Sequence, residues 1–255
     1  MNGRGHLILT RLLVLVFALS MGSPAAWTGQ YEMHSGHQQA EQTEHNGSRD
    51  LMRDHHGDPT AHRFPSVHKA LELFENPERD VWQKPDEVAA HMRRLPGDLV
   101  IDLGAGTGYF ARRFAALVGP EGAVLGLDVE ASMVEFMNAD AQKRGLKNYM
   151  ARQVKSNDPQ LSPGSANVIF ICNTYHHLPD RVDYVRALVP SLRPNGRVIV
   201  VDFKDGSIPI GPPPEWRLSS NAVEKEFQHA GLDLVRSVEF LPYQYFLEFS
   251  RPITD

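Results

Sequence analysis

The sequence predicts an α/β fold, in which helices pack on a sheet. First, an apolar run, an acid and a glycine-rich turn follow one another in Val100–Phe110, the layout of a strand, a tight loop and a helix start. Second, apolar runs of strand length recur at 123–128, 167–171 and 196–203. Third, residues 232–240 and 243–249 alternate as the strands of a hairpin do.

Length and charge narrow the class of protein. The chain has 255 residues, and roughly 190 remain after a leader and a polar stretch are removed, enough for one sizeable core. The formal net charge is −5. Because the sequence has no basic patch of the kind that binds nucleic acid, a nucleic-acid partner is not expected. The sequence leaves the oligomeric state open.

Residues 1–26 have the pattern of a secretory signal peptide. Arg4 and Arg11 form the positive region, residues 12–19 the apolar region, and small residues before Ala26 favour cleavage after Ala25. The apolar run is too short for an ordinary membrane span, so no stable span is expected after cleavage. We therefore expect an exported protein, periplasmic or secreted. If the start codon is misassigned, the protein is cytoplasmic and begins at Met21, Met33 or Met52.

Residues 27–63 form a polar, histidine-rich segment that we expect to be a disordered linker. His34 and His37 offer two metal ligands at close range, as histidine-rich tracts can. No cysteine and no ordered ligand spacing supports a metal site, and a solvated linker is the favoured interpretation.

Residues 64–255 are predicted to form one domain, in which 64–95 is a helical cap and 96–255 the core sheet. Helices are expected at 68–74 and 86–94, with Pro85 in the first turn of the second. The connection at 76–85 contains four candidates for the wall of a pocket: Arg79, Asp80, Trp82 and Gln83. The alternative is a surface helix–turn–helix with Trp82 packed on the sheet.

The glycine loop itself limits the choice of cofactor. Gly104, Gly106 and Gly108 alternate, and Tyr109 stands where a dinucleotide site has its third glycine. A bulky residue there argues against NAD or FAD. Asp102 would repel a pyrophosphate and suits a cationic ligand that carries an amino group.

Residues 102–108 resemble motif I, (D/E)xGxGxG, of the class I S-adenosylmethionine (SAM) methyltransferases. The resemblance is strong from about 95 to 204 and weaker for 219–249. It implies a Rossmann-like seven-stranded sheet, mostly parallel with the last strand antiparallel, and helices on both faces. It also implies SAM as cofactor, a glycine loop beneath its methionine part, and a supporting role for Asp102.

The second strand pattern ends in Asp128, 20 residues after Gly108. An acid at this position can accept hydrogen bonds from both ribose hydroxyls, and the resemblance implies this role for Asp128. Glu130 is the alternative. Met133 matches a position that packs on adenine in the family, although it is equally compatible with a helix core.

The third strand pattern leads from Tyr149 into Asn157 and Asp158. The resemblance implies that one of these two contacts the adenine amino group. Because Asn, Asp and Pro all favour turns, residues 157–159 alternatively form only a turn.

The fourth strand runs into polar and aromatic residues, which we expect at the ligand-binding edge of the sheet. They include Asn173, assigned to the cofactor, and Tyr175, His176 and His177, the candidate catalytic residues. A histidine there can act as a general base for a hydroxyl or carbon acid, and Tyr175 can orient the acceptor. The His-His pair resembles the ubiquinone/menaquinone-type (type 11) branch of the family. Cys172, the single cysteine, is expected to be a structural thiol.

The fifth strand follows Leu192–Gly196, which resembles a turn of the family with Asn195 in place of a glycine. Asn tolerates the left-handed backbone nearly as well. The Pro-rich stretch 206–216 lies at the ligand edge and is expected to line the acceptor site. Ser219 or Ser220 can cap the following helix.

These observations favour a SAM-dependent methyltransferase that acts on a small molecule. The alternative is an exported, non-catalytic protein that binds SAM or metal on the same scaffold. A nicotinamide-dependent enzyme is disfavoured by Tyr109. No metal ligands are assigned.

Overall fold

The computed structural model describes residues 66–93 and 96–253. The predicted leader (1–26) and polar segment (27–63) lie outside the described residues, so both stay predictions. Within the described part of the chain, no helix is long and apolar enough to cross a membrane.

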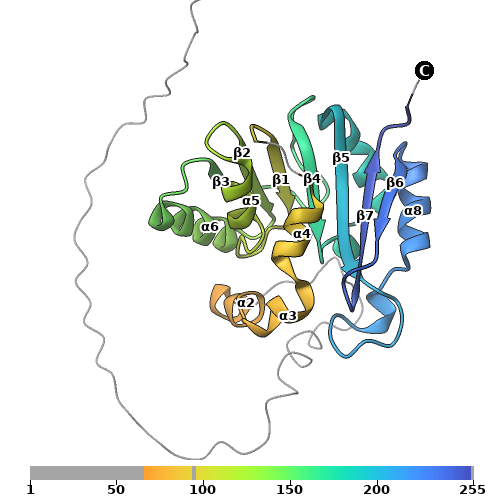
Figure 1. Ribbon diagram of the computed structural model, residues 1–255, viewed down its shortest axis with the longest axis horizontal. Coiled ribbons are helices and arrows are strands. Elements are labelled where there is room, and N and C mark those ends of the chain that lie inside the picture. Colours follow the sequence, from red (N-terminus) through yellow and green to blue (C-terminus); the bar gives the residue numbers. More distant parts are fainter. Residues whose placement is uncertain (1–65, 94–95, 254–255) are drawn as a thin grey trace, which may run out of the picture. The chain divides into compact units, whose positions relative to one another are not determined.

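A seven-stranded sheet with the order β3-β2-β1-β4-β5-β7-β6 forms the centre of the structure (Figure 1). Strands β1 to β5 pair in parallel, and β7 runs antiparallel to both of its neighbours. The predicted sheet, with its last strand antiparallel, is thus confirmed. The strands are β1 Leu99–Leu103, β2 Ala123–Asp128, β3 Tyr149–Gln153, β4 Ala166–Cys172, β5 Leu192–Phe203, β6 Asp233–Val238 and β7 Gln244–Ser250.

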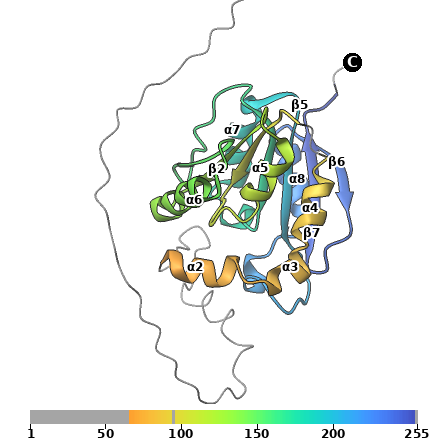
Figure 2. The same cartoon turned by 60° about the vertical axis from the view of Figure 1, so that its left-hand side comes forward.

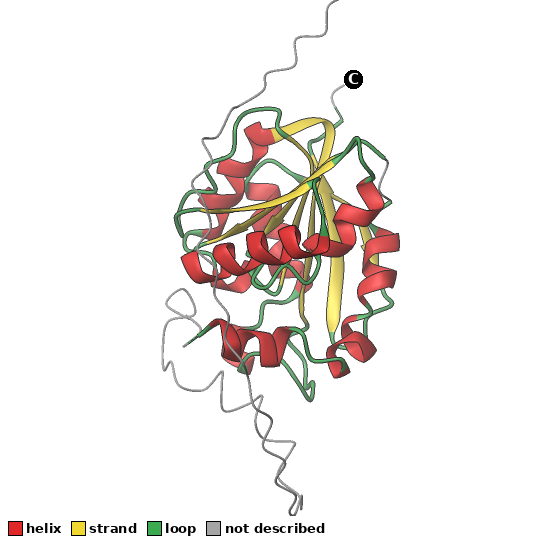
Figure 3. Cartoon of the chain, turned by 90° about the vertical axis from the view of Figure 1, so that its left-hand side faces the viewer, coloured by secondary structure: helices red, strands yellow, loops and turns green. Residues whose placement is uncertain are grey.

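Helices lie on both sides of this sheet (Figure 3). Residues of α4, α5 and α6 share one hydrophobic core with one face of the sheet, and residues of α7 and α8 share a second core with the other face. The helices are α2 Val67–Phe74, α3 Glu78–Gln83, α4 Pro85–His91, α5 Ala111–Val118, α6 Ala131–Arg144, α7 Arg181–Leu188 and α8 Ser220–His229. Short 3₁₀ turns are η2 Tyr175–His177, η3 Val189–Ser191 and η4 Pro214–Trp216.

The central strands read as continuous apolar runs because both of their faces are buried. Val100 belongs to the core on the α5 side, and its neighbour Ile101 belongs to the core on the α8 side. Val168 and Ile169 of β4 divide in the same way. Cys172, at the end of β4, packs on the α5 side and is a free thiol.

Several local predictions hold at the ends of elements. Pro85 is the first residue of α4. The turn predicted at Leu192–Gly196 is instead the first part of β5, in which Asn195 has a left-handed φ of 59°. Ser219 caps α8, since its side chain accepts the backbone N–H of Ala222 at 3.1 Å. The predicted connection at 76–85 contains a helix of its own, α3.

Helices α2 and α3 lie below the lower edge of the sheet in Figures 1 and 2. Both helices contribute to a cavity whose other walls come from the carboxyl ends of the parallel strands. The sheet order reverses between β1 and β4, and open α/β sheets bind ligands outside the carboxyl ends at such a point. The topology therefore places the candidate site here.

Candidate functional site

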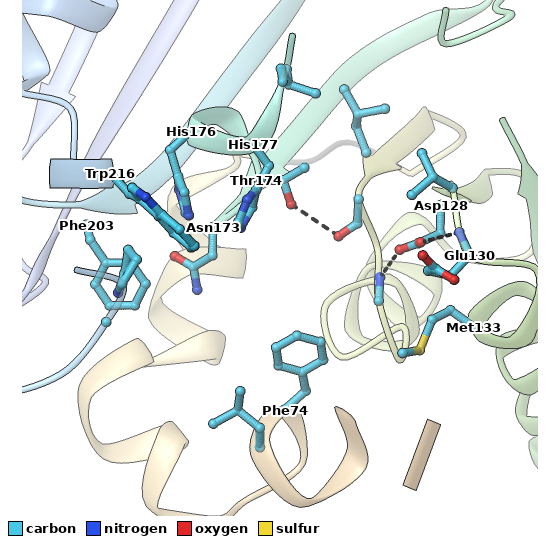
Figure 4. Close-up of a pocket in the computed structure, with 18 of the residues that line it drawn as sticks. Phe74, Asp128, Glu130, Met133, Asn173, Thr174, His176, His177, Phe203 and Trp216 are labelled. Carbon is cyan, nitrogen blue, oxygen red and sulfur yellow. Dashed lines mark hydrogen bonds between the residues drawn. The ribbon is translucent and has the colours of Figure 1, made fainter. Parts of the chain in front are cut away.

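A cavity of about 320 Å³ opens at the carboxyl ends of β1, β2, β4 and β5 (Figure 4). Phe74 of α2 and Arg79 and Trp82 of α3 close it from the opposite side. The volume falls within the range of small-molecule sites, roughly 300–1,000 Å³. The cap segment thus forms part of a pocket, whereas Asp80 and Gln83, two of its predicted pocket residues, do not line it.

The glycine loop forms the turn from β1 to α5. Gly104 and Gly106 line the cavity, and Gly106 donates its N–H to Oδ2 of Asp128 at 2.8 Å. A Cβ on Gly104 would overlap Thr174, whose hydroxyl donates to the Gly104 carbonyl at 3.3 Å. This loop is therefore shaped by its contacts with β2 and with the end of β4.

Gly108 differs from the other two glycines, because it does not line the cavity. Its φ is 77°, and a Cβ would overlap the hydroxyl of Tyr149. The role of Gly108 in this structure is to let the loop pass close to β3, and its assignment to cofactor binding is not supported by its position.

Asp102 is buried, with 3% of its surface exposed, and also lies outside the cavity lining. Burial raises the pKa of its carboxyl to about 7, opposed by a hydrogen bond from the backbone N–H of Ala111 and by the charges of Arg79 and Arg112. The charge of Asp128 raises the pKa further. Asp102 is thus a buried residue of β1 and not part of the cavity wall, and its supporting role stays a prediction.

Asp128 ends β2 on the wall of the cavity, as predicted. Its Oδ1 accepts the backbone N–H of Glu130 at 2.9 Å, and its Oδ2 accepts that of Gly106 (dashed lines in Figure 4). Burial raises the pKa of Asp128, while these two donors lower it. A carboxylate has about four lone-pair sites, so acceptor capacity remains toward the cavity. Glu130, the alternative, also lines the cavity.

An apolar wall continues from Asp128 along the start of α6. Met133 is 2% exposed and lines the cavity together with Leu127 and Val154. It therefore belongs both to the pocket wall and to the buried interior, which agrees with either interpretation made from the sequence.

Asn157 and Asp158 do not line the cavity, and Ser156 does. Asp158 Oδ1 accepts the backbone N–H of Gln160 at 2.8 Å, an Asx-type turn contact. The assignment of Asn157 and Asp158 to the cofactor is thus corrected: they form the turn that was the alternative.

Arg79 brings a cation to the cavity. Its guanidinium lies 3.9 Å from the centroid of the Tyr109 ring and donates to the carbonyl of Phe74 at 3.0 Å. It also donates to the side-chain amide oxygen of Gln83, at 3.3–3.4 Å. Burial lowers the pKa of Arg79. Since these hydrogen-bond acceptors are neutral, an anionic ligand group would find an electrostatic partner here.

The far half of the cavity is aromatic and apolar. Phe203, Trp216 and Pro212 line it, and the ring of His177 lies 6.3 Å from that of Trp216 in an edge-on arrangement. The ring of Phe203 packs against that of Trp82, with their centroids 5.7 Å apart. The prediction that the Pro-rich stretch lines a pocket at this edge is supported by Ile210, Gly211, Pro212 and Trp216.

His176 is a buried member of the cavity wall, 4% exposed. Its Nδ1 lies 2.9 Å from both carboxylate oxygens of Asp202, which is itself 2% exposed. Oδ1 of Asp202 also accepts the backbone N–H of Phe203 at 2.8 Å. Figure 4 shows His176 and His177 pointing into the cavity side by side, and their ring centroids are 4.0 Å apart.

Tyr175 points away from this cavity, and its predicted role in orienting an acceptor is wrong. It is fully buried in the core on the α8 side, and its hydroxyl donates to Oε2 of Glu226 at 2.7 Å. Arg181 pairs with the same carboxylate at 2.6 Å. Tyr175 therefore belongs to a link between η2, α7 and α8.

Asn173 lines the cavity in a left-handed conformation, with a φ of 53°. Its amide joins a chain of side-chain amides: Nδ2 donates to Gln83 at 3.3 Å, and Oδ1 accepts from Gln244 at 2.5 Å. Gln83 also donates to Gln244 at 2.6 Å. These buried bonds fix the cap helix α3 to β4 and β7 next to the cavity.

The family comparison agrees with this fold and site. A family model described as "Methyltransferase domain" matches residues 95–238, and the chain belongs to this family of class I SAM-dependent methyltransferases. SAM is the cofactor that the family uses. The match begins after the cap helices and ends before β7, so it covers the glycine loop and strands β1 to β6.

Named relatives point to the same family. A demethylmenaquinone methyltransferase of Lactococcus lactis is 28% identical over 133 residues, which are 52% of this chain and 52% of the relative, so the similarity spans only half of that relative. The C-methyltransferase UbiE of ubiquinone/menaquinone biosynthesis from Ectopseudomonas mendocina is 25% identical over 178 residues, 68% of this chain and 69% of the relative.

A solved structure extends the likeness to the three-dimensional fold. The crystal structure of a SAM-dependent methyltransferase from Aquifex aeolicus is 27% identical and superposes with a TM-score of 0.68. The match covers 72% of this chain and 97% of that one.

The residues present fit SAM in their donor and acceptor chemistry. Asp128 offers acceptor sites for hydroxyl groups, and Met133 and Leu127 offer an apolar surface for a base. Arg79 offers a cation whose hydrogen-bond acceptors are neutral. The cavity thus matches a ligand that carries a sugar, a flat ring system and a carboxylate.

Sequence reasoning missed Asp202, Phe203, Phe74 and Thr174. A signal existed for Asp202, since it follows the apolar run of β5 just as Asp128 follows that of β2. No signal in the sequence predicted the position of Phe74, because its place beside Gly106 depends on where α2 packs below the edge of the sheet.

Proposed function

We propose that this chain transfers a methyl group from SAM to a small-molecule acceptor held in the same cavity. The observation that carries the proposal is the division of one cavity into two halves. Figure 4 shows Asp128 and Met133 on one side of the cavity and Phe203 and Trp216 on the other, and Arg79 also lines it. When bound, SAM supplies an electrophilic methyl group on a positively charged sulfur.

Three residues would hold the cofactor. Asp128 would accept its ribose hydroxyls as charge-assisted hydrogen bonds. Met133 would pack against its adenine, and Arg79 would meet its carboxylate. Asp102, buried behind the loop, would favour the amino group through its charge when that carboxyl is ionised.

The acceptor half favours a compound with a flat apolar ring. Phe203, Trp216 and the edge of His177 offer aromatic surfaces, which stack on rings in preferred geometries. The relatives named for demethylmenaquinone and for ubiquinone/menaquinone biosynthesis support a small-molecule acceptor.

The chain's contribution to the reaction is positioning and exclusion of water. Methyl transfer from a sulfonium is an in-line displacement with a neutral leaving group, so orientation of the two partners supplies much of the rate. The cap helices α2 and α3 close the cavity opposite the sheet, which keeps solvent from the reacting groups.

Calorimetric titration with S-adenosylhomocysteine (SAH) tests the cofactor half. Asp128→Asn keeps one acceptor oxygen and loses a hydrogen bond to charge, worth about 1.5–3 kcal/mol, so affinity should fall roughly 10- to 100-fold. Glu239→Gln, an exposed carboxylate paired with Lys204, is the matched control and should leave affinity unchanged. Glu130→Gln separates the two candidate acids. If wild-type protein does not bind SAH, the proposal is wrong.

Transfer of radiolabelled methyl groups to a panel of aromatic acceptors then tests the reaction. A protein that binds SAH and transfers nothing would support the non-catalytic alternative. Within the described residues, no group of three or more His, Cys, Asp or Glu side chains could hold a metal ion. The histidine-rich segment lies outside these residues, and metal titration with and without residues 27–63 addresses it.

We further propose export, on the leader pattern of residues 1–26. Cell fractionation with N-terminal sequencing tests this proposal. A mature protein that begins near residue 26 outside the cytoplasm would support export, and a cytoplasmic protein that begins at Met21, Met33 or Met52 would contradict it.

A further inference from the structure

The His176–Asp202 pair has a geometry that methyl transfer to an amine would not need. His176 lies on the cavity wall, and Asp202 lies behind it at the end of β5. Both side chains are almost fully buried. A buried charge is costly unless it is paired and hydrogen-bonded, so the arrangement calls for a functional account.

The donors around Asp202 determine which nitrogen of His176 carries the proton. Asp202 accepts the backbone N–H of Phe203 at 2.8 Å and that of His176 at 3.4 Å. Both oxygens also face Nδ1 of His176 at 2.9 Å. An ionised carboxylate only accepts, so Nδ1 must donate. In the neutral ring, Nε2 then has a free lone pair.

No described residue is hydrogen-bonded to Nε2, although the ring lines the cavity. A neutral imidazole that is held by a carboxylate and has its other nitrogen open to a ligand is the arrangement of a general base. The neighbouring ring of His177, at 4.0 Å, and the aromatic half with Trp216 surround the place that an acceptor would occupy.

We propose that His176 is the general base of the reaction, that Asp202 positions it, and that the acceptor is a weakly acidic hydroxyl such as a phenol or enol. This proposal rests on the methyl transfer proposed above. The acceptor hydroxyl gives its proton to Nε2 as its oxygen forms the new bond to carbon and the carbon–sulfur bond breaks. The positive charge lost from sulfur ends on the imidazole ring, where Asp202 offsets it.

An amine acceptor would fit this site poorly. A neutral amine attacks with its own lone pair and needs no base in the bond-forming step, whereas a hydroxyl is a weak nucleophile until its proton leaves. An oriented, buried base therefore accelerates methyl transfer only to acceptors that must lose a proton.

Two variants separate the roles of the pair. His176→Gln keeps a polar side chain on the wall and removes the base, so turnover should fall roughly 100- to 10,000-fold with SAH affinity unchanged. In Asp202→Asn, the remaining oxygen is needed by the Phe203 N–H, so the amide nitrogen faces Nδ1. The proton then moves to Nε2, and kcat should fall while KM changes little.

Nitrogen-15 NMR of protein labelled in its histidine rings reads the tautomer without any acceptor. Wild-type His176 should show a protonated Nδ1 and a bare Nε2, and Asp202→Asn should show the reverse. Assignment uses the signal that His176→Gln removes. A wild-type ring protonated only at Nε2 overturns the proposal, whatever the activity.

Transfer to matched acceptors tests the chemistry, with 2-naphthol and 2-naphthylamine as probes. Transfer to naphthol that depends on His176 supports the proposal. Transfer to the amine that survives His176→Gln overturns it and leaves the proposed function intact. SAH binding without transfer to either probe counts against the proposed function with these acceptors. The NMR experiment still decides which ring nitrogen of His176 carries the proton.

Discussion

Asp102→Asn tests how much the ionised, buried carboxylate of Asp102 lowers the free energy of unfolding of the ligand-free protein. Asp102 is 3% exposed, and burial raises its pKa to about 7. In an unfolded chain an Asp carboxyl has a pKa of about 3.9. The folded protein therefore holds this proton more tightly than the unfolded chain. The resulting stabilisation is fully present below about pH 3.9 and is lost as the pH rises through 7.

The size of the effect follows from the two pKa values. Where the folded protein holds one proton more than the unfolded chain, the free energy of unfolding falls by about 1.4 kcal/mol per pH unit. Half of the folded molecules are ionised at pH 7, so the loss between pH 5 and pH 7 amounts to about 2 kcal/mol. Asn does not titrate, and the variant lacks this contribution.

Urea unfolding of both proteins at pH 5 and pH 7, without ligand, measures the difference. The free energy of unfolding of Asp102→Asn relative to wild type should rise by about 2 kcal/mol between the two pH values. Any fixed packing cost of the amide cancels, because only the change with pH is compared. Glu239→Gln, at an exposed carboxylate, is the control and should follow the wild type.

Parallel pH dependence of wild type and Asp102→Asn would refute the reasoning, since it would mean that Asp102 is ionised throughout this range. The same carboxylate links stability to binding. A cationic amino group on the ligand favours its ionised form, so SAH should bind wild type more tightly at pH 8 than at pH 6. The variant should lack this difference.

Three further predictions concern stability. Gly108→Ala should lower the melting temperature more than Gly145→Ala, because both have a φ of 70–77° but only the new Cβ at 108 overlaps Tyr149; equal shifts would contradict this. Glu248→Gln should cost about 3 kcal/mol in urea unfolding, since three arginines pair with this buried carboxylate, and a loss below about 1 kcal/mol would disprove it. Ser219→Ala removes a helix cap and should cost about 1 kcal/mol by the same assay, against none if the cap is unimportant.

The elements of the sheet could be predicted because each carries its own local signal. Central parallel strands are buried on both faces and read as apolar runs, as Val168–Ile171 does. Pro85 and Ser219 mark helix starts through their own backbone and side-chain chemistry. The segment around α3 was less predictable, because its six residues depend on contacts of Gln83 and Arg79 made elsewhere.

Site residues at the end of a strand could be predicted from the sequence, whereas the orientation of residues in a turn could not. Asp128 follows directly from the apolar run of β2 and lies on the cavity wall. Asn157 and Asp158 share the chemistry of a ligand-binding pair, but a turn directs Asp158 to the backbone of Gln160. Residue type and position in the sequence did not reveal whether Asn157 and Asp158 contact a ligand or form a turn.

The sequence by itself determined the class of fold, the glycine loop and Asp128, because these depend on periodicity, on backbone freedom and on the order of strands. Only the tertiary structure decided which way Tyr175 and His176 point. In the 3₁₀ turn η2, successive side chains diverge by about 120°, so Tyr175 enters the core and His176 reaches the cavity. Asp202 meets His176 only because β4 and β5 pair side by side, which brings residues 26 positions apart into contact.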